Sequence, residues 1–185
     1  MALTYKMREG EQYRGLDNLC KFIKSHNHID NISIVEIGSY CGDSGRILAR
    51  NFPNGIINCV DPWTSYTEDC STCDLHRQAL ELKEAELLFD DMSKEYTNVI
   101  KNKISSIEYS KTVQDESIDM VYIDGNHQYS SIVEDLENWS KKVRTGSYVA
   151  GHDYSWDSVK RAVNDFFKRP PDATFEDSSW IYIKP

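Results

Sequence analysis

The stretch Val121-Tyr122-Ile123-Asp124-Gly125-Asn126-His127-Gln128-Tyr129 is typical of a buried β-strand that ends in an aspartate, a glycine and a histidine. A second stretch, Tyr148-Val149-Ala150-Gly151-His152-Asp153-Tyr154, repeats that layout further along the chain. Each stretch would deliver an aspartate and a histidine to the carboxyl end of a strand. In an open α/β sheet these ends form the crevice in which ligands bind. The two stretches therefore predict an α/β fold with a chemical site at one edge of its sheet.

The size and charge of the chain restrict its class. With 185 residues it is most simply one domain over residues 1–185, of which residues 1–30 form a helical extension. The net charge of −9 argues against a nucleic-acid partner, because phosphate binding depends on Lys and Arg. No apolar run is long enough to span a bilayer, so no membrane partner is expected. These features predict an acidic cytoplasmic enzyme that acts on a small molecule.

The cysteines are odd in number and follow no apolar signal segment, which favours reduced thiols in the cytoplasm. Cys70 and Cys73, in a Cys-x-x-Cys arrangement with His76 nearby, could hold zinc, although a structural zinc site needs four ligands. An ordinary loop with incidental cysteines is the alternative. Cys41 lies in a glycine-rich loop, where an incidental small residue explains it better than a nucleophile does.

Hydrophobic periodicity predicts an alternating order of strands and helices. Strands are expected over 32–37, 56–60, 97–104, 119–123 and 147–150, helices over 11–26, 44–51, 75–96, 131–143 and 156–168, and a hairpin over 173–176 and 179–184. The helix over 75–96 packs on the core or serves as a movable lid. Asp43 or Ser44 is expected to cap the helix over 44–51, and Ser131 with Glu134 to form a capping box. This order predicts a seven-stranded, mostly parallel sheet with helices on both faces and an antiparallel strand near the carboxyl terminus.

A glycine-rich turn, Gly38-Ser39-Tyr40-Cys41-Gly42-Asp43-Ser44-Gly45, follows the first strand. The dinucleotide fingerprint is G-x-G-x-x-G, but this turn carries Tyr40 where the second glycine of that fingerprint would stand. A bulky side chain there would obstruct a pyrophosphate, so a ligand without phosphates is expected. Glu36, just before the turn, adds negative charge and favours an ammonium or sulfonium group.

Asp61 ends the second strand, at the distance from the glycine turn that is typical of an acid binding ribose hydroxyls. Trp63 follows closely enough in sequence to stack on a purine. An ordinary turn would explain either residue alone. The glycine turn and the acid together predict a nucleoside site.

Four motifs stand in order along the chain: Val35-Glu36-Ile37-Gly38-Ser39-Tyr40, Val60-Asp61-Pro62-Trp63, Ile123-Asp124-Gly125-Asn126-His127 and Gly151-His152-Asp153-Tyr154. Together they resemble the class I S-adenosylmethionine-dependent methyltransferases over about residues 30–168. The most similar branch contains small-molecule O-methyltransferases that act on macrolide and aminocoumarin sugars. The resemblance implies a Rossmann-like methyltransferase fold and S-adenosylmethionine bound at the carboxyl edge of the sheet.

The resemblance also implies roles for single residues. Gly38 and the neighbouring backbone would hold the amino-acid part of S-adenosylmethionine, and Asp61 would hold its ribose. The adenine would lie near the serines that follow the third strand. The full expected set for this ligand is Glu36, Gly38, Ser39, Tyr40, Gly42, Ser44, Asp61, Pro62, Trp63, Ser105, Ser106, Asp124, Gly125 and His127.

A sugar hydroxyl is a poor nucleophile at neutral pH, and a divalent cation can stabilise its alkoxide as a Lewis acid. Asp124 and Asp153 can share one ion if their strands are neighbours, because neighbouring strands lie about 4.8 Å apart. Oxygen ligands suit Mg²⁺ or Mn²⁺, and His152 favours a transition metal. The metal-dependent sugar enzymes carry acids at both positions of their second motif, and here His152 occupies one of them. The alternative is that Asp124 and His152 are structural hydrogen-bond partners.

The expected catalytic residues are Asp124, His127 and Asp153. In the sugar enzymes an acid two residues after the first metal ligand is the proposed base, but Asn126 stands there and cannot accept a full proton. His127 is the next candidate because imidazole titrates near neutral pH, and contact with adenine is its alternative role. The acceptor would be a small hydroxylated molecule, and a homodimer could complete its pocket. Two other functions stay open: a non-catalytic nucleoside-binding module and an NAD-dependent oxidoreductase.

Overall fold

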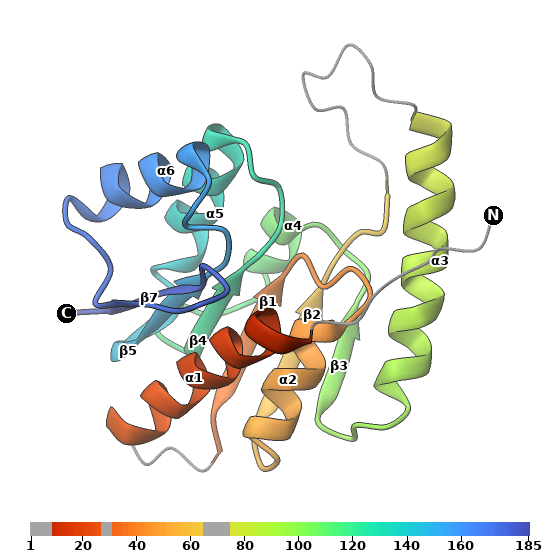
Figure 1. Cartoon of the computed structure of the whole chain (residues 1–185), viewed down its shortest axis with the longest axis horizontal. Coiled ribbons are helices and arrows are strands. Elements are labelled where there is room, and N and C mark those ends of the chain that lie inside the picture. The colour runs from red at the N-terminus through yellow and green to blue at the C-terminus, as the bar shows by residue number, and fades with distance from the viewer. Residues whose placement is uncertain (1–8, 27–30, 65–74) are drawn as a thin grey trace.

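The structure is a computed structural model that describes residues 9–26, 31–64 and 75–185 (Figure 1). Helices and strands alternate over most of the chain. In chain order they are α1 (Gly10–His26), β1 (Ser33–Ile37), α2 (Asp43–Asn51), β2 (Ile56–Val60), α3 (Leu75–Ser93), β3 (Val99–Asn102), α4 (Ser106–Ser110), β4 (Ile118–Ile123), α5 (Tyr129–Trp139), β5 (Val143–Gly151), α6 (Asp157–Phe167), β6 (Ala173–Thr174) and β7 (Trp180–Ile183).

The strands form one seven-stranded sheet in the order β3-β2-β1-β4-β5-β7-β6. β3, β2, β1, β4 and β5 are parallel, whereas β7 pairs antiparallel with both β5 and β6. This arrangement confirms the predicted mostly parallel sheet with an antiparallel strand near the carboxyl terminus. The order reverses between β1 and β4, and such a switch point opens a crevice at the carboxyl edge of a sheet. The loops after β1 and β4 therefore start side by side.

Two apolar layers cover the two faces of the sheet. Buried side chains of α1, α2 and α3, such as Leu16, Ile47 and Phe89, pack on one face. Leu136 of α5 and Val163 of α6 pack on the other. Figure 1 shows α1 and α2 in front of the sheet and α3 standing beside β3. Every residue of β4 is buried, as expected for a central strand covered on both faces.

The ends of several elements differ from the prediction, and three of these differences bear on the site. α2 starts at Asp43 after Gly42, which has φ +84° and caps the helix without a side-chain hydrogen bond. α5 starts at Tyr129, so Ser131 lies inside the helix and the predicted capping box with Glu134 is wrong. The helix also ends earlier than predicted, and β5 begins at Val143. The five-residue helix α4 was not predicted, since a helix of that length leaves little periodic signal.

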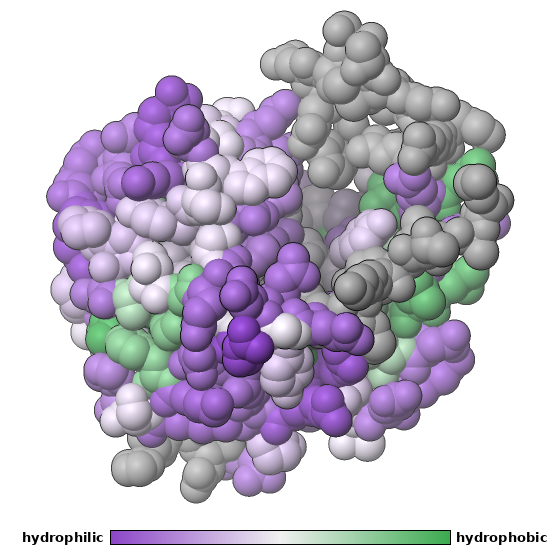
Figure 2. All heavy atoms as spheres, in the orientation of Figure 1, coloured by the Kyte–Doolittle hydropathy of each residue, from purple (hydrophilic) through white to green (hydrophobic). Residues whose placement is uncertain are grey.

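α3 packs on the core through Ala85, Phe89 and Met92. Its opposite side exposes Leu80 and Leu87. Figure 2 shows hydrophobic residues at the surface along α3. The burial of Ala85, Phe89 and Met92 agrees with the predicted packing of this helix on the core.

The thiols of Cys20, Cys41 and Cys59 are free and buried. The zinc prediction depends on Cys70 and Cys73, which lie outside the described residues. Of the helices described, none combines the length and the apolar character needed to cross a bilayer.

Candidate active site

A cavity of about 410 Å³ opens at the carboxyl edge of the sheet, between the loops that follow β1, β2, β3 and β4. The loops bring together side chains that are far apart in the sequence. The predicted site residues that line this cavity are Gly38, Ser39, Tyr40, Ser44, Asp61, Pro62, Ser105, Ser106, Asp124, Gly125 and His127. Glu36, Gly42 and Trp63 are not among its lining residues.

The glycine turn after β1 touches the loop after β4 directly. Gly38 has φ +86°, and a Cβ built on it would lie 2.2 Å from the carbonyl oxygen of Asp124 and 2.6 Å from Cα of Gly125. The Asp124 N–H donates to the carbonyl of Ile37, 2.8 Å away, and ties the two strand ends together. Only glycine combines this backbone conformation with so close an approach. Tyr40 adopts φ +44° in the same turn, which adds local strain at the cavity wall.

Asp61 ties the first two loops together. Its Oδ2 accepts the Tyr40 N–H at 3.0 Å, and its Oδ1 accepts the Trp63 N–H at 2.7 Å. Burial raises the pKa of this carboxyl, while the two N–H donors act in the opposite direction. Each carboxylate oxygen has a second lone pair, so Asp61 can still accept hydrogen bonds from a ligand hydroxyl in the cavity.

Trp63 and Glu36 take up positions behind the cavity wall. The Trp63 ring packs edge-on against Phe89 of α3, with ring centroids 5.1 Å apart, and its indole N–H donates to the Tyr40 carbonyl. Trp63 therefore supports the glycine turn from behind instead of offering a face for a purine.

Glu36 is fully buried and accepts the Ser39 hydroxyl at 2.7 Å. Burial raises its pKa, although hydrogen bonds from Ser44 and Ser39 oppose that shift. The expectation that Glu36 faces a cationic ligand does not fit this position, because its carboxyl lies beneath the turn. Gly42 likewise lies away from the cavity, where an added Cβ would strike the methyl group of Met92.

Beside Ser105 and Ser106, the cavity wall includes Asp135 of α5, a residue absent from the predicted site. Its side chain is buried, and burial raises its pKa to about 6. The Ser106 hydroxyl donates to Asp135 Oδ1 at 2.5 Å and accepts the indole N–H of Trp139 at 2.8 Å. The sequence carried one signal, since Asp135 interrupts the apolar face of its helix between Ile132 and Leu136.

The raised pKa of Asp135 predicts that the Asp135→Asn variant becomes more stable than the wild type as pH rises. The folded pKa of about 6 exceeds the ordinary 3.8, so the folded state favours the neutral carboxyl. Ionisation of Asp135 therefore lowers the stability of the wild type as pH rises from about 4 to about 6. The loss reaches roughly 2–3 kcal/mol above pH 6. Urea unfolding at pH 5 and pH 8 measures this change. Glu134→Gln, at an exposed position on the same helix, should show no such trend, and a constant difference between Asp135→Asn and wild type contradicts the prediction.

The two aspartate–histidine stretches meet beside the cavity. In the parallel register Ile123 lies opposite Gly151, so the residues that follow them are neighbours. His152 Nδ1 lies 3.5 Å from Asp124 Oδ1 and 3.3 Å from Asp153 Oδ2. His127 Nε2 lies 2.8 Å from Asp153 Oδ2. Asp124 and His127 line the cavity, so this cluster borders it on the side of β4 and β5.

The histidines and Asp153 of this cluster shift one another's pKa values. The hydrogen bond to Asp153 raises the pKa of His127, against the effect of burial. Burial alone would raise the pKa of Asp153, but hydrogen bonds from His127 and His152 outweigh it and hold that pKa well below its ordinary value. Asp153 therefore stays ionised, and His127 is a stronger base than free imidazole.

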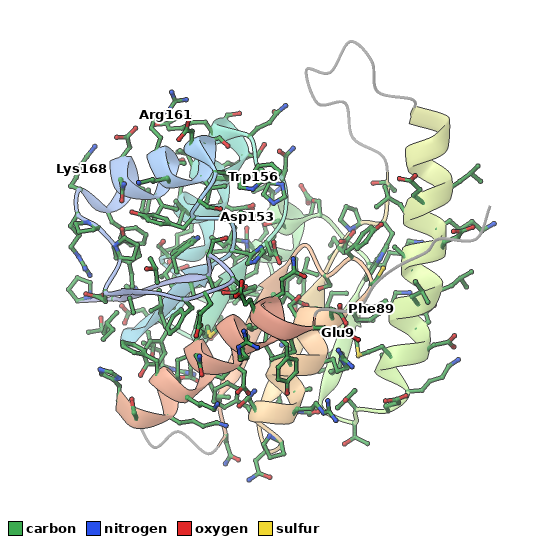
Figure 3. All side chains as sticks on the ribbon, viewed as in Figure 1. Glu9, Phe89, Asp153, Trp156, Arg161 and Lys168 are labelled. Atoms are coloured by element: carbon green, nitrogen blue, oxygen red, sulfur yellow. The ribbon has the colours of Figure 1, made fainter. Side chains whose placement is uncertain are left out.

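Two further residues that were not predicted lie beside the cluster. Asp177 is buried with its Oδ2 4.0 Å from His152 Nε2, on the opposite side of that ring from Asp124. The Trp156 ring lies 4.8 Å from the His127 ring and is half exposed. Figure 3 shows Trp156 and Asp153 close together beneath α6, with Phe89 across the site on α3.

The fit of a metal ion depends on Asp124, His152 and Asp153. One potential ligand atom from each lies within 4.8 Å of the other two. Two carboxylates and one imidazole form a donor set that suits Mn²⁺ and related transition metals. Mg²⁺ prefers oxygen ligands alone, so the imidazole makes it a poorer fit. The residues present therefore fit a divalent transition metal.

A family model described as a methyltransferase domain matches residues 35–154, from β1 to the residue after Asp153. The chain belongs to this methyltransferase family. The matched range contains the glycine turn, Asp61, Ser106, Asp124 and His152. Membership confirms the resemblance to the class I S-adenosylmethionine-dependent enzymes, and this methyltransferase uses S-adenosylmethionine as its methyl donor.

Solved structures have the same fold as this methyltransferase. The O-methyltransferase NovP has a TM-score of 0.67 at 19% identity, covering 93% of this chain and 79% of that one. The precorrin-6y C5,15-methyltransferase of Geobacter metallireducens has a TM-score of 0.59 at 14% identity, covering 89% and 75%. Among curated proteins no sequence matches the chain. At these identities the likeness establishes the fold, whereas the acceptor must be argued from the site.

Proposed function

We propose that this methyltransferase transfers the methyl group of S-adenosylmethionine to a hydroxyl oxygen of a small acceptor, such as a sugar or a natural-product intermediate. One observation carries the proposal: Gly38, Asp61 and Asp124 share a single hollow, with a paired His127 and Asp153 at its border. The first three residues suit a nucleoside with a charged tail. The pair suits removal of a proton from an acceptor held next to that tail.

The donor is held by the backbone of the glycine turn and by Asp61. The turn can approach the amino-acid part closely, because Gly38 has no side chain and Tyr40 N–H is fixed by Asp61. The Asp61 carboxylate accepts hydrogen bonds from the ribose. The acidic side chains that follow β4 and β5, Asp124 and Asp153, favour a sulfonium over a neutral or anionic tail.

Methyl transfer is an in-line displacement in which the acceptor oxygen forms a bond to the methyl carbon as the carbon–sulfur bond breaks. The bonding electrons stay on sulfur, which becomes a neutral thioether. His127 accepts the hydroxyl proton of the acceptor, and Asp153 stabilises the resulting imidazolium at 2.8 Å. Alignment of the acceptor with the methyl group supplies much of the rate, as for other reactions between two bound substrates.

Asp124, His152 and Asp153 would hold a divalent metal ion beside the acceptor. Such an ion supplies Lewis acidity that stabilises the acceptor alkoxide. His152 Nδ1 faces the two carboxylates, while its Nε2 lies 4.0 Å from Asp177 Oδ2. Asn126 takes no part in proton transfer, since its Oδ1 accepts the Gln128 N–H at 2.8 Å and shapes the turn.

The paired His127 and Asp153 favour an enzyme over a nucleoside-binding module without chemistry. A binding module has no need of an imidazole whose pKa is raised at the border of the cavity. Tyr40 in the glycine turn speaks against an NAD-dependent oxidoreductase, as the pyrophosphate of NAD requires a small residue there.

Calorimetry with S-adenosylhomocysteine and with NAD tests the donor site. We expect saturable heat with the first ligand and none with the second. Asp61→Asn should weaken S-adenosylhomocysteine by roughly 10–100-fold, because a buried acceptor of ribose hydrogen bonds is lost. Asp157→Asn, an exposed change on α6, should bind like the wild type. Binding of NAD, or equal affinity of Asp61→Asn and wild type, would refute this assignment of the donor site.

A further inference from the structure

Asp177 is a buried acid beside the aspartate–histidine cluster, and the proposed methyl transfer assigns it no role. It lies in the turn between β6 and β7, and its side chain is 0% exposed. Among the residues that the structure describes, His152 is the only basic side chain within 4.0 Å of its carboxylate. Burying a carboxylate costs free energy unless hydrogen bonds and an opposite charge compensate for it. The groups around Asp177 therefore show what this carboxylate can act on.

Hydrogen bonds hold the Asp177 carboxylate in one orientation. Its Oδ1 accepts the Ser179 N–H and its Oδ2 accepts the Ser179 hydroxyl, both at 2.9 Å. Because the single hydroxyl proton of Ser179 is used in this way, the Tyr122 hydroxyl donates to Ser179 Oγ, 2.9 Å away. Tyr122 and Ser179 are fully buried, so water does not compete for these bonds.

Helix α1 closes the other side of this carboxylate. A Cβ built on Gly15 would lie 2.1 Å from Asp177 Oδ1, so the backbone of α1 packs directly against that oxygen. The second oxygen, Oδ2, keeps a lone pair after its bond to Ser179. This oxygen lies 4.0 Å from His152 Nε2. Oδ2 is therefore the atom through which Asp177 acts on the cluster.

The segment that carries Asp177 also holds the backbone of His152. The indole N–H of Trp180, at the start of β7, donates to the His152 carbonyl at 3.0 Å. On the opposite side of the ring, His152 Nδ1 lies 3.5 Å from Asp124 Oδ1 and 3.3 Å from Asp153 Oδ2. Asp177 thus faces the ring nitrogen that points away from the two candidate metal ligands.

We propose that Asp177 is a positioning residue for a divalent metal ion: its carboxylate keeps an N–H on His152 Nε2, so that the lone pair of Nδ1 faces the ion between Asp124 and Asp153. The proposal rests on the metal-assisted part of the proposed function. A metal-bound imidazole commonly donates its other N–H to a carboxylate or a carbonyl, which fixes the tautomer and the orientation of the ring. At 4.0 Å the pair is an ion pair and not a direct hydrogen bond, and burial keeps its attraction weakly screened.

Calorimetry with Mn²⁺ tests this role on the full chain at pH 7.5, after a chelator has removed any metal. The wild type should bind Mn²⁺ saturably, and Asp177→Asn should bind it about 10–100-fold more weakly. In this variant an amide NH₂ can face Nε2, which favours a proton on Nδ1 and blocks the ligand atom. Glu176→Gln makes the same chemical change at the neighbouring exposed residue and should bind Mn²⁺ like the wild type. Circular dichroism establishes that both variants are folded.

Nitrogen-15 NMR of the histidines in the Zn²⁺-loaded protein gives a readout that a general loosening of the fold would not produce. Zn²⁺ is diamagnetic and accepts imidazole and carboxylate ligands. The signals absent from His152→Gln are those of His152. They should show the metal on Nδ1 and the proton on Nε2. The Nε2–H signal should shift in Asp177→Asn and stay in place in Glu176→Gln.

The outcomes separate this proposal from the proposed function. If Asp177→Asn binds Mn²⁺ like the wild type, or leaves the Nε2–H signal of His152 unchanged, Asp177 does not position the ring, while the metal site stands. If the wild type binds neither Mn²⁺ nor Zn²⁺, this proposal and the metal-assisted part of the proposed function both fail. The donor site is judged separately by its affinity for S-adenosylhomocysteine.

Discussion

The Gly38→Ala variant is expected to lose roughly 2–5 kcal/mol of folding stability and its binding of S-adenosylhomocysteine. A Cβ at this position would lie 2.2 Å from the Asp124 carbonyl oxygen, and the obstructing atoms belong to backbone that cannot rotate away. The estimate combines the cost of a left-handed backbone for alanine with that of overpacking a closed contact. Any relief would push the loop after β4 away from the glycine turn and widen the donor site.

Gly146→Ala is the matched control for this effect. Gly146 also has a positive φ, of +78°, but a Cβ there would meet nothing within 4 Å. This control carries the backbone strain without the collision, so it should lose only about 1–2 kcal/mol and bind the donor normally. Urea unfolding and calorimetry on both variants give the comparison. Equal losses of stability in the two variants would show that the close contact between the glycine turn and the β4 loop adds nothing to the cost of backbone strain.

The Asp153→Asn variant is expected to lose at least about 100-fold in turnover on an identified acceptor while binding S-adenosylhomocysteine like the wild type. Asp153 is not among the cavity-lining residues, but its carboxylate lies 2.8 Å from His127 Nε2 and belongs to the candidate metal cluster. Asparagine suits the φ of +57° at this position, so the backbone should be kept. The loss should therefore appear in kcat and not in donor affinity.

The pH profile of Asp153→Asn distinguishes a role in proton transfer from simple misfolding. Asp153 raises the pKa of His127, and a base must be deprotonated to act. The rate of the wild type should therefore rise with pH through a midpoint above the ordinary value for histidine. In the variant that midpoint should move to lower pH while the plateau falls. Metal analysis of both proteins reports on the shared carboxylate, and undiminished turnover by Asp153→Asn would eliminate both roles.

The strands and the loops after them were predictable because they leave strong local signals. The β-branched run that ends at Ile37 and the apolar run that ends at Ile123 are each closed by a residue that cannot continue a buried strand. Once such strands are parallel neighbours, Gly38 and Asp124 must meet at one edge. The α/β sheet and the meeting of the two aspartate–histidine stretches follow from this rule.

Side-chain direction was harder to predict from sequence. Trp63 stands at a position from which it could stack on a purine, but Phe89 of the distant α3 offers its ring an apolar contact. Asp135 interrupts an apolar helical face, and sequence periodicity cannot tell whether such an acid faces a core or a cavity. The start of α5 was misplaced because Asn126 turns the chain early through its hydrogen bond to Gln128 N–H.

Asp124 contributes to both halves of the site, through its backbone carbonyl and through its side chain. Its carbonyl touches the turn at Gly38, while its carboxylate faces His152. Under the proposed function, the spacing between the S-adenosylmethionine site and the aspartate–histidine cluster is therefore fixed by the sheet. The half-exposed Trp156, whose ring lies 4.8 Å from that of His127, stands outside this fixed spacing, and we expect exchanges there to change the acceptor range without moving the glycine turn.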